Sequence, residues 1–207
     1  MSKSLNALFT TLLLTTAGNA LAASSVDLTV KGLITPSACE PTLPIGGNID
    51  IGKISARDLK ADADTFLDDH ILQLTVTCDA PTLVAIEPHD NRAGSSSNDH
   101  PTSFGLGLIN TTEKLGYLEI DLQSPSADGV ASRGIRSLDN GATWTRGASL
   151  FTGAISSVAN NTTDTPIPVQ LFTANLNIAA SIAPTSGLTL TEEVPIDGSV
   201  TLTVKYL

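Results

Sequence analysis

Histidines are the side chains of this sequence best suited to hold a metal or to move a proton. His89 and His100 flank a polar loop that also contains Asp90 and Asp99. Two imidazoles and two carboxylates would together make a plausible metal-ligand set. Spacing within a loop gives these side chains no common face, so the pattern favours a solvated polar loop. The same holds for His70, which follows two aspartates. We therefore predict no metal site.

Motifs of the common catalytic and nucleotide-binding sites are absent from the sequence. It has no G-x-S-x-G nucleophile elbow, no Walker phosphate loop and no dinucleotide-binding glycine pattern. We expect no catalytic residues and no cofactor, and the protein is not predicted to be an enzyme.

One short motif, Ser137–Trp144, reads S-x-D-x-G-x-T-W and is similar to the Asp-box of sialidases. Asn140-Gly141 is a strong turn signal, Asp139 can accept hydrogen bonds from the turn, and Trp144 can pack beneath it. A propeller needs several such copies, whereas this sequence has one. We interpret the motif as a local hairpin device of Ser137, Asp139, Gly141 and Trp144, with a carbohydrate contact of Trp144 as the alternative.

The N-terminus has the features of an export signal. Residues 1–22 contain Lys3, an apolar run and the small-residue cleavage site Ala20-Leu21-Ala22. The apolar run is too short to span a bilayer, so no transmembrane segment is expected after cleavage. Export favours a disulfide, and Cys39 and Cys78 are the only cysteines.

Composition and charge restrict the fold and the partners. Charged residues make up only 15% of the 207 residues, hydrophobic residues 41%, and the net charge is −10. Basic residues are sparse and scattered, which argues against nucleic acid as a partner. The chain is rich in threonine, which suits pleated strands.

Most segments alternate apolar and polar residues with the period of a strand, and turn residues separate them. Residues 55–65, which begin with Ser55-Ala56-Arg57-Asp58, could form a short capped helix. Short strands without intervening helices predict one antiparallel sandwich or barrel domain over residues 36–207. The clearest strand candidates are 71–78, 83–86, 117–122, 167–172, 176–182 and 200–207.

Residues 23–35 before the first cysteine allow two interpretations. Their alternating apolar residues can form the first strand of a complete sandwich, or an arm that pairs with another chain. Both interpretations need one apolar face, so alternation does not separate them. The residues on that face are Val26, Leu28, Val30, Gly32 and Ile34.

The layout of the chain resembles subunits of chaperone–usher fimbriae, most closely those of the β-fimbrial branch. The resemblance rests on the signal peptide, the 32–39 segment ending in Cys39, the single cysteine pair, and the C-terminal strand with penultimate Tyr206. It implies an immunoglobulin-like sandwich that lacks its last strand. The family's glycine 14 residues from the C-terminus is Val194 here, and Gly198 lies nearer the end.

The resemblance also implies a mechanism and partners. A periplasmic chaperone and then the arm of a neighbouring pilus subunit would fill the gap, at an outer-membrane usher, by β-strand addition. The subunit would pass through the periplasm to a fimbrium on the cell surface and support cell adhesion. The alternative is a self-contained secreted sandwich that binds a ligand such as glycan. If the chain is a fimbrial subunit, the arm residues named above insert into the groove of a neighbouring subunit. The groove is then lined by Val200, Leu202, Val204 and Tyr206.

Overall fold

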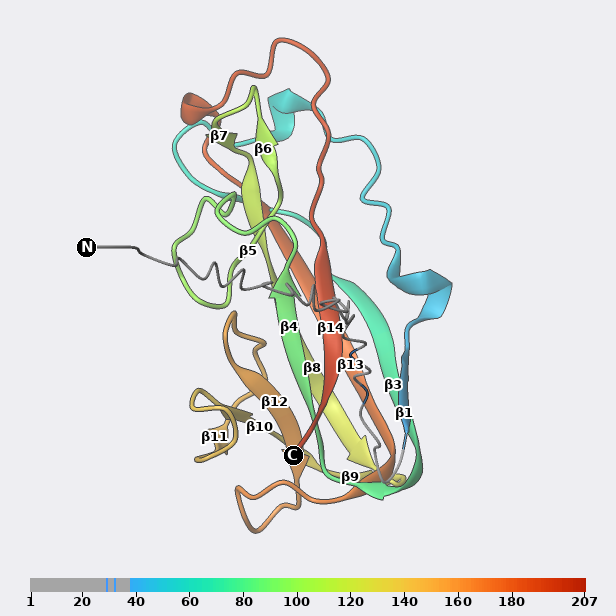
Figure 1. Cartoon of the computed structure of the whole chain (residues 1–207). Coiled ribbons are helices and arrows are strands. Elements are labelled where there is room, and N and C mark those ends of the chain that lie inside the picture. Colours follow the sequence, from blue (N-terminus) through green and yellow to red (C-terminus); the bar gives the residue numbers. More distant parts are fainter. Residues whose placement is uncertain (1–28, 30–31, 33–37) are drawn as a thin grey trace, which may run out of the picture. The chain divides into compact units, whose positions relative to one another are not determined.

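The chain folds as an all-β protein in the computed structural model, which describes Thr29, Gly32 and residues 38–207 (Figure 1). The signal peptide and the arm positions Val26, Leu28, Val30 and Ile34 lie outside the described residues. No helix in the described part is long and apolar enough to cross a bilayer. Its strands are β1 (Cys39–Thr42), β2 (Thr65–Phe66), β3 (His70–Thr82), β4 (Val84–Asp90), β5 (Phe104–Gly105), β6 (Leu108–Ile109), β7 (Glu113–Lys114), β8 (Gly116–Ala127), β9 (Val130–Ala131), β10 (Arg133–Ser137), β11 (Thr145–Arg146), β12 (Ile155–Ala159), β13 (Val169–Ile182) and β14 (Val200–Tyr206).

Two antiparallel sheets form the two layers of the sandwich. One sheet has the strand order β1-β3-β13-β8-β5, with β2 added beside β13 and β9 beside β8, and the other has the order β11-β10-β12-β4-β14. The strands β6 and β7 form a separate small hairpin. This arrangement confirms the predicted antiparallel β-sandwich, and a disulfide joins Cys39 to Cys78 as predicted.

The core lies between the sheets and follows the period of two along the long strands. Leu74 and Val76 of β3, Leu176 of β13 and Ile86 of β4 are almost fully buried. Their neighbours along each strand point outward, which is why the alternation in the sequence predicts these faces well.

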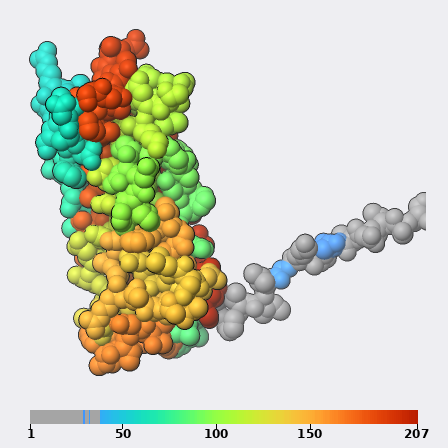
Figure 2. Space-filling model, turned by 90° about the vertical axis from the view of Figure 1, so that its left-hand side faces the viewer, coloured from blue at the N-terminus to red at the C-terminus, as the bar shows by residue number. Residues whose placement is uncertain are grey.

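The two long sides of the sandwich differ. On the side that carries β10 and β11, Leu122 N–H donates to Ala148 O and Leu150 N–H donates to Ile120 O. The segment after β11 thereby ties the second sheet to β8 of the first. Figure 2 faces this side, and residues of the β10–β12 region cover its lower half in gold and orange. On the opposite side, no backbone–backbone hydrogen bond joins β1 to β14 among the described residues.

Two strand boundaries differ from the sequence prediction. The residues Asp79-Ala80-Pro81 do not form a turn between two strands, because β3 continues to Thr82 and still pairs there with Val169. The chain then crosses at Leu83 into the other sheet as β4. The two runs predicted within 167–182 likewise form the single strand β13, which begins at Val169.

The segment predicted as a possible helix forms only one turn of 3-10 helix, η2 (Ala56–Asp58), capped by the Ser55 side chain. Two further 3-10 turns are η1 (Pro44–Gly47) and η3 (Thr185–Gly187).

Candidate functional site

The C-terminal strand β14 forms one edge of the second sheet. It pairs with β4 along its whole length, from Val200 opposite Asp90 to Tyr206 opposite Val84. No strand pairs with its other edge among the described residues. Its side chains alternate as expected: Thr201 and Thr203 are exposed, whereas the three aliphatic residues are partly buried against the core, namely Val200, Leu202 and Val204.

The strand β1 forms the facing edge of the first sheet. It pairs with β3, with Cys39 directly opposite Cys78, so the disulfide fixes the strand at its first residue. The outer edge of β1 has no partner strand within the described part of the chain. Two sheet edges with unpaired backbone groups therefore border the same side of the sandwich, and such edges readily accept another strand.

An apolar cleft lies between these two edges, which we call the strand cleft. Its lower part has a volume of about 390 Å³. Leu202 from β14 and Leu43, just after β1, form its walls, and inward-facing residues of three core strands form its floor. The floor residues are Leu72, Leu74, Leu118, Ile120, Leu176 and Ile178.

A second stretch of cleft, of about 510 Å³, follows farther along the same strands, toward the C-terminal end of β13. Ile51 and Ile54 form one wall, and Val194 and Ile196 form the other. Ile182 of β13, four residues beyond Ile178, belongs to its lining. Aliphatic side chains thus also line this stretch beside the segment that precedes β14, together with the charged residues Asp50, Lys53, Glu192 and Glu193.

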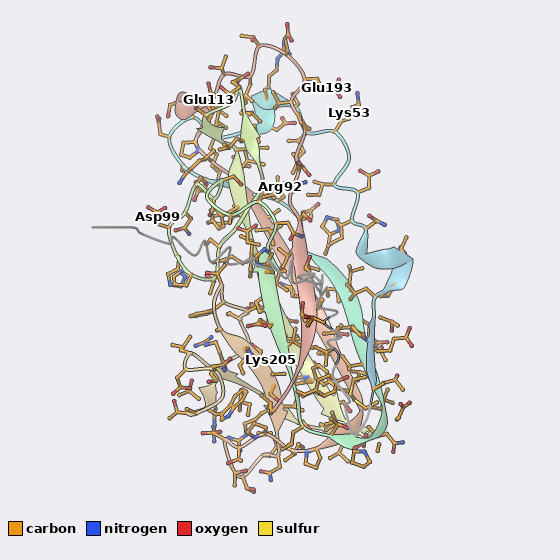
Figure 3. All side chains as sticks on the ribbon, viewed as in Figure 1. Lys53, Arg92, Asp99, Glu113, Glu193 and Lys205 are labelled. Carbon is orange, nitrogen blue, oxygen red and sulfur yellow. A yellow bond between two sulfur atoms is a disulfide. The ribbon has the colours of Figure 1, made fainter. Side chains whose placement is uncertain are left out.

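Two polar contacts cross the strand cleft, one near each end. At the lower end the Tyr206 hydroxyl accepts a hydrogen bond of 2.9 Å from the Cys39 backbone N–H. At the upper end Lys53 Nζ lies 2.9 Å from Glu193 Oε1, and Figure 3 shows the two side chains facing each other. Both partners of this ion pair are largely exposed, so it contributes little to stability.

The segment just before β14 is held in place by contacts of Asp197 and Gly198. Arg92 donates to both carboxylate oxygens of Asp197, at 2.9 and 2.7 Å, and its side chain is labelled in Figure 3. These hydrogen bonds lower the pKa of Asp197 and raise that of Arg92. A Cβ on Gly198 would lie 2.8 Å from side-chain carbons of both Leu106 and Leu118. A side chain at this position would therefore require the ends of Leu106 and Leu118 to shift.

Among the predicted arm residues, Gly32 alone is described. It is exposed, and an added Cβ would meet nothing within 4 Å. Of the predicted groove residues of β14, Val200 and Leu202 line the strand cleft, and Val204 is partly buried against the core. The exposed Tyr206 uses its hydroxyl to reach β1. Sequence reasoning missed the floor of the cleft. Its signal was present, because strict alternation in 71–78 and 117–122 already marked Leu74 and Ile120 as inward-facing.

The Asp-box hairpin is held by its own side chains. Asp139 accepts hydrogen bonds from the backbone N–H and the hydroxyl of Thr143 and from the Ser137 hydroxyl. These bonds lower its pKa from 3.8 to about 2. Asn140 and Gly141 both have positive φ, as a tight turn requires. Trp144 Nε1 donates to Gly141 O.

The four candidate ligands of the histidine loop lie near one another, but the described residues do not place them to hold a metal. His89, Asp90, Asp99 and His100 line a common polar depression, in which the Asp90 carboxylate is buried and accepts the N–H groups of Arg92 and Gly105. His100 Nδ1 is 2.7 Å from the Thr102 hydroxyl, which donates to Glu119. The described residues contain no group of three or more His, Cys, Asp or Glu placed to hold a metal.

Comparisons with known proteins show similarity to a protein family and to relatives from Escherichia coli. A family described as "Protein of unknown function (DUF1120)" matches residues 28–121. The chain is 27% identical to Protein GltF of Escherichia coli strain K12 over 233 residues, which cover 91% of this chain and 92% of GltF. It is 29% identical to the uncharacterized protein YhcF of the same strain over 100 residues, which cover 48% of this chain and 42% of YhcF. The chain is therefore similar to GltF over nearly its whole length.

Proposed function

We propose that the chain is a structural subunit of a surface fimbria, assembled by donor-strand exchange. The observation that supports this most is the strand cleft: an apolar channel bordered by two sheet edges that have no partner strand among the described residues. A strand added there would satisfy backbone groups of both edges and bury the floor. It would complete the sandwich.

The N-terminal arm has the pattern that this cleft requires. Val26, Leu28 and Val30 would share one face of an extended strand, and Ile34, four residues after Val30, would belong to the same face. The nine arm residues 26–34 would span roughly 30 Å when extended, at about 3.3 Å per residue. This length exceeds that of β14, which has seven residues. The arm is therefore long enough to cover the lower cleft and to reach the second stretch.

Assembly from one chain to the next follows from this geometry. The arm of one copy would occupy the cleft of another, and because donor and acceptor surfaces differ, the contact repeats as an open filament. A free subunit would expose the apolar floor, which explains the need for a periplasmic chaperone and an outer-membrane usher as partners. Fimbria-mediated adhesion at the cell surface is the role that this assembly would serve.

The first test changes the donor side. The Leu28→Asp variant should abolish SDS-resistant oligomers on an unheated gel, because a carboxylate cannot enter an apolar floor without a large cost. The matched control, Thr29→Asp, changes the neighbouring residue on the other face of the strand and should still form the ladder. Equal ladders for both variants would count against strand donation.

The second test changes the acceptor side. Leu202→Asp places a charge in the cleft, whereas Thr203→Asp places the same charge on the exposed face of the same strand. We expect only Leu202→Asp to prevent polymerisation, in cells that also supply the chaperone and the usher. Polymers from Leu202→Asp subunits would refute the proposed role of the cleft.

A further inference from the structure

Another cleft, distinct from the strand cleft, lies at the edge of the second sheet that is opposite β14. About 540 Å³ in volume, it opens between β8 and the β10–β11 hairpin. In the strand order β11-β10-β12-β4-β14 it is separated from the strand cleft by the full width of the sheet. Its surroundings are the gold region of Figure 2. A strand added beside β14 would leave this cleft open.

Positive charge gathers here in an otherwise acidic chain. Three of the five arginines, Arg133, Arg136 and Arg146, lie on the hairpin. Residues 130–165 contain only two acidic residues, Asp139 and Asp164, so this stretch has a net charge of +1 (three minus two) in a chain of −10. Asp139 is engaged within the Asp-box turn. The cleft is therefore a local site of attraction for an anion.

Arg133 and Arg146 both line the cleft and share one acceptor. Asp164 Oδ1 lies 3.0 Å from Arg133 Nη1 and 3.3 Å from Arg146 Nε. This single oxygen therefore accepts from both guanidinium groups. Each guanidinium has further N–H donors that have no partner within residues 38–207. Arg133 Nη2 in particular is buried and has no hydrogen-bond partner in the described part of the chain. Buried donors are rarely left unpaired, but a ligand cannot reach this one without displacing its neighbours. The N–H donors open to an acceptor are therefore those of Arg146, whose side chain is 71% exposed.

Neutral polar groups surround the two arginines. Gln123, Ser124 and Asn161 also line the cleft. Ser124 has a φ of 48° and lies at a bulge of β8, where the register with β13 shifts between Thr173 and Asn175. Bulges re-aim side chains and are frequent beside binding sites. Amide and hydroxyl groups beside a guanidinium pair suit a ligand that bears hydroxyls as well as a negative group.

We propose that this arginine cleft, formed by Arg133, Arg146, Gln123, Ser124 and Asn161, binds the carboxylate or sulfate group of an acidic saccharide. The guanidinium fork of Arg146, 71% exposed, receives the anion, because planar N–H donors match the paired oxygens of such groups. Arg133, 13% exposed, forms the fixed inner wall. The neutral side chains then contact the sugar hydroxyls.

Calorimetric titration of the mature chain, residues 23–207, tests the proposal. The probes are sialyllactose for the carboxylate, sulfated lactose for the sulfate, and neutral lactose. We expect one or both acidic sugars to bind, more weakly as salt is raised, and lactose to bind at least about tenfold more weakly. The proposal would be overturned if lactose bound with the same affinity as both acidic sugars, or if neither acidic sugar bound.

Arginine variants provide the second arm. Arg146→Ala should weaken binding of the acidic sugar by at least about tenfold. Arg57→Ala removes the same charge from an exposed position in η2 and should leave the affinity within about twofold. Equal losses in the two variants would show attraction by net charge alone and overturn the site. Tighter binding of a glutamate-rich peptide than of either sugar would overturn the saccharide assignment.

Discussion

Gly198 is the residue at which the chain entering β14 lies close to core side chains. An added methyl group would meet Leu106 and Leu118 at 2.8 Å, which forces side chains or backbone to shift. We expect Gly198→Ala to lower the free energy of unfolding by about 1–3 kcal/mol, the usual cost of overpacking. Urea denaturation measures this, with Gly187→Ala as control because nothing lies within 4 Å of its added Cβ. Equal stability of the two variants would contradict the close approach of β14 to the core.

Asp139 gives the Asp-box hairpin a defined response to pH. Its pKa falls from 3.8 to about 2 because Thr143 and Ser137 donate to the ionised carboxylate. A folded-state pKa below the unfolded one contributes stability above about pH 4, and this contribution is lost as pH falls toward 2. Asp139→Ala should therefore melt at a lower temperature than the wild type at pH 7, and the difference should narrow between pH 4 and pH 2. A difference that stays constant over that range would contradict the hydrogen-bonded carboxylate.

At the scale of elements, the disulfide determines how firmly β1 forms its wall of the strand cleft. The strand has four residues and is bonded to β3 at its first position. The two cysteines are 39 residues apart in sequence. On the chain-entropy model, replacing both by alanine should cost about 4 kcal/mol. Chemical denaturation would detect this loss, and an unchanged midpoint would show that β1 is held by other contacts.

Local patterns predicted the long strands well and the connections poorly. Alternation in 71–78 and 117–122 predicted the inward faces of β3 and β8, because a period of two follows from backbone geometry alone. The sequence Asp79-Ala80-Pro81 looked like a turn, yet Thr82 pairs with Val169 and the strand continues. Tertiary pairing overrode the local turn signal there. The arginine cleft was not predicted, because Arg133 and Arg146 meet only through the hairpin and Asp164.

At the scale of the whole molecule, backbone hydrogen bonds join the two sheets on one side of the sandwich, whereas on the other side no described strand lies between the edges of β1 and β14. The segment at Ala148–Leu150 bonds to β8 on the first side. On the second side, the strand cleft runs between β1 and β14 over an apolar floor. Exposed apolar surface of this kind favours association with another chain. We propose that the N-terminal arm of a second copy covers this floor.

The most direct measurement adds the missing strand as a peptide. A chain of residues 35–207 is refolded with and without a peptide of residues 23–35, and the melting temperature of each sample is recorded. We expect the peptide to bind the chain with 1:1 stoichiometry and to raise its melting temperature. The reason is that a ligand that binds only the folded state stabilises that state. A peptide with Leu28→Asp should have no effect, and one with Thr29→Asp should act like the natural sequence. A melting temperature that the natural peptide leaves unchanged would contradict the claim that the strand cleft accepts this arm.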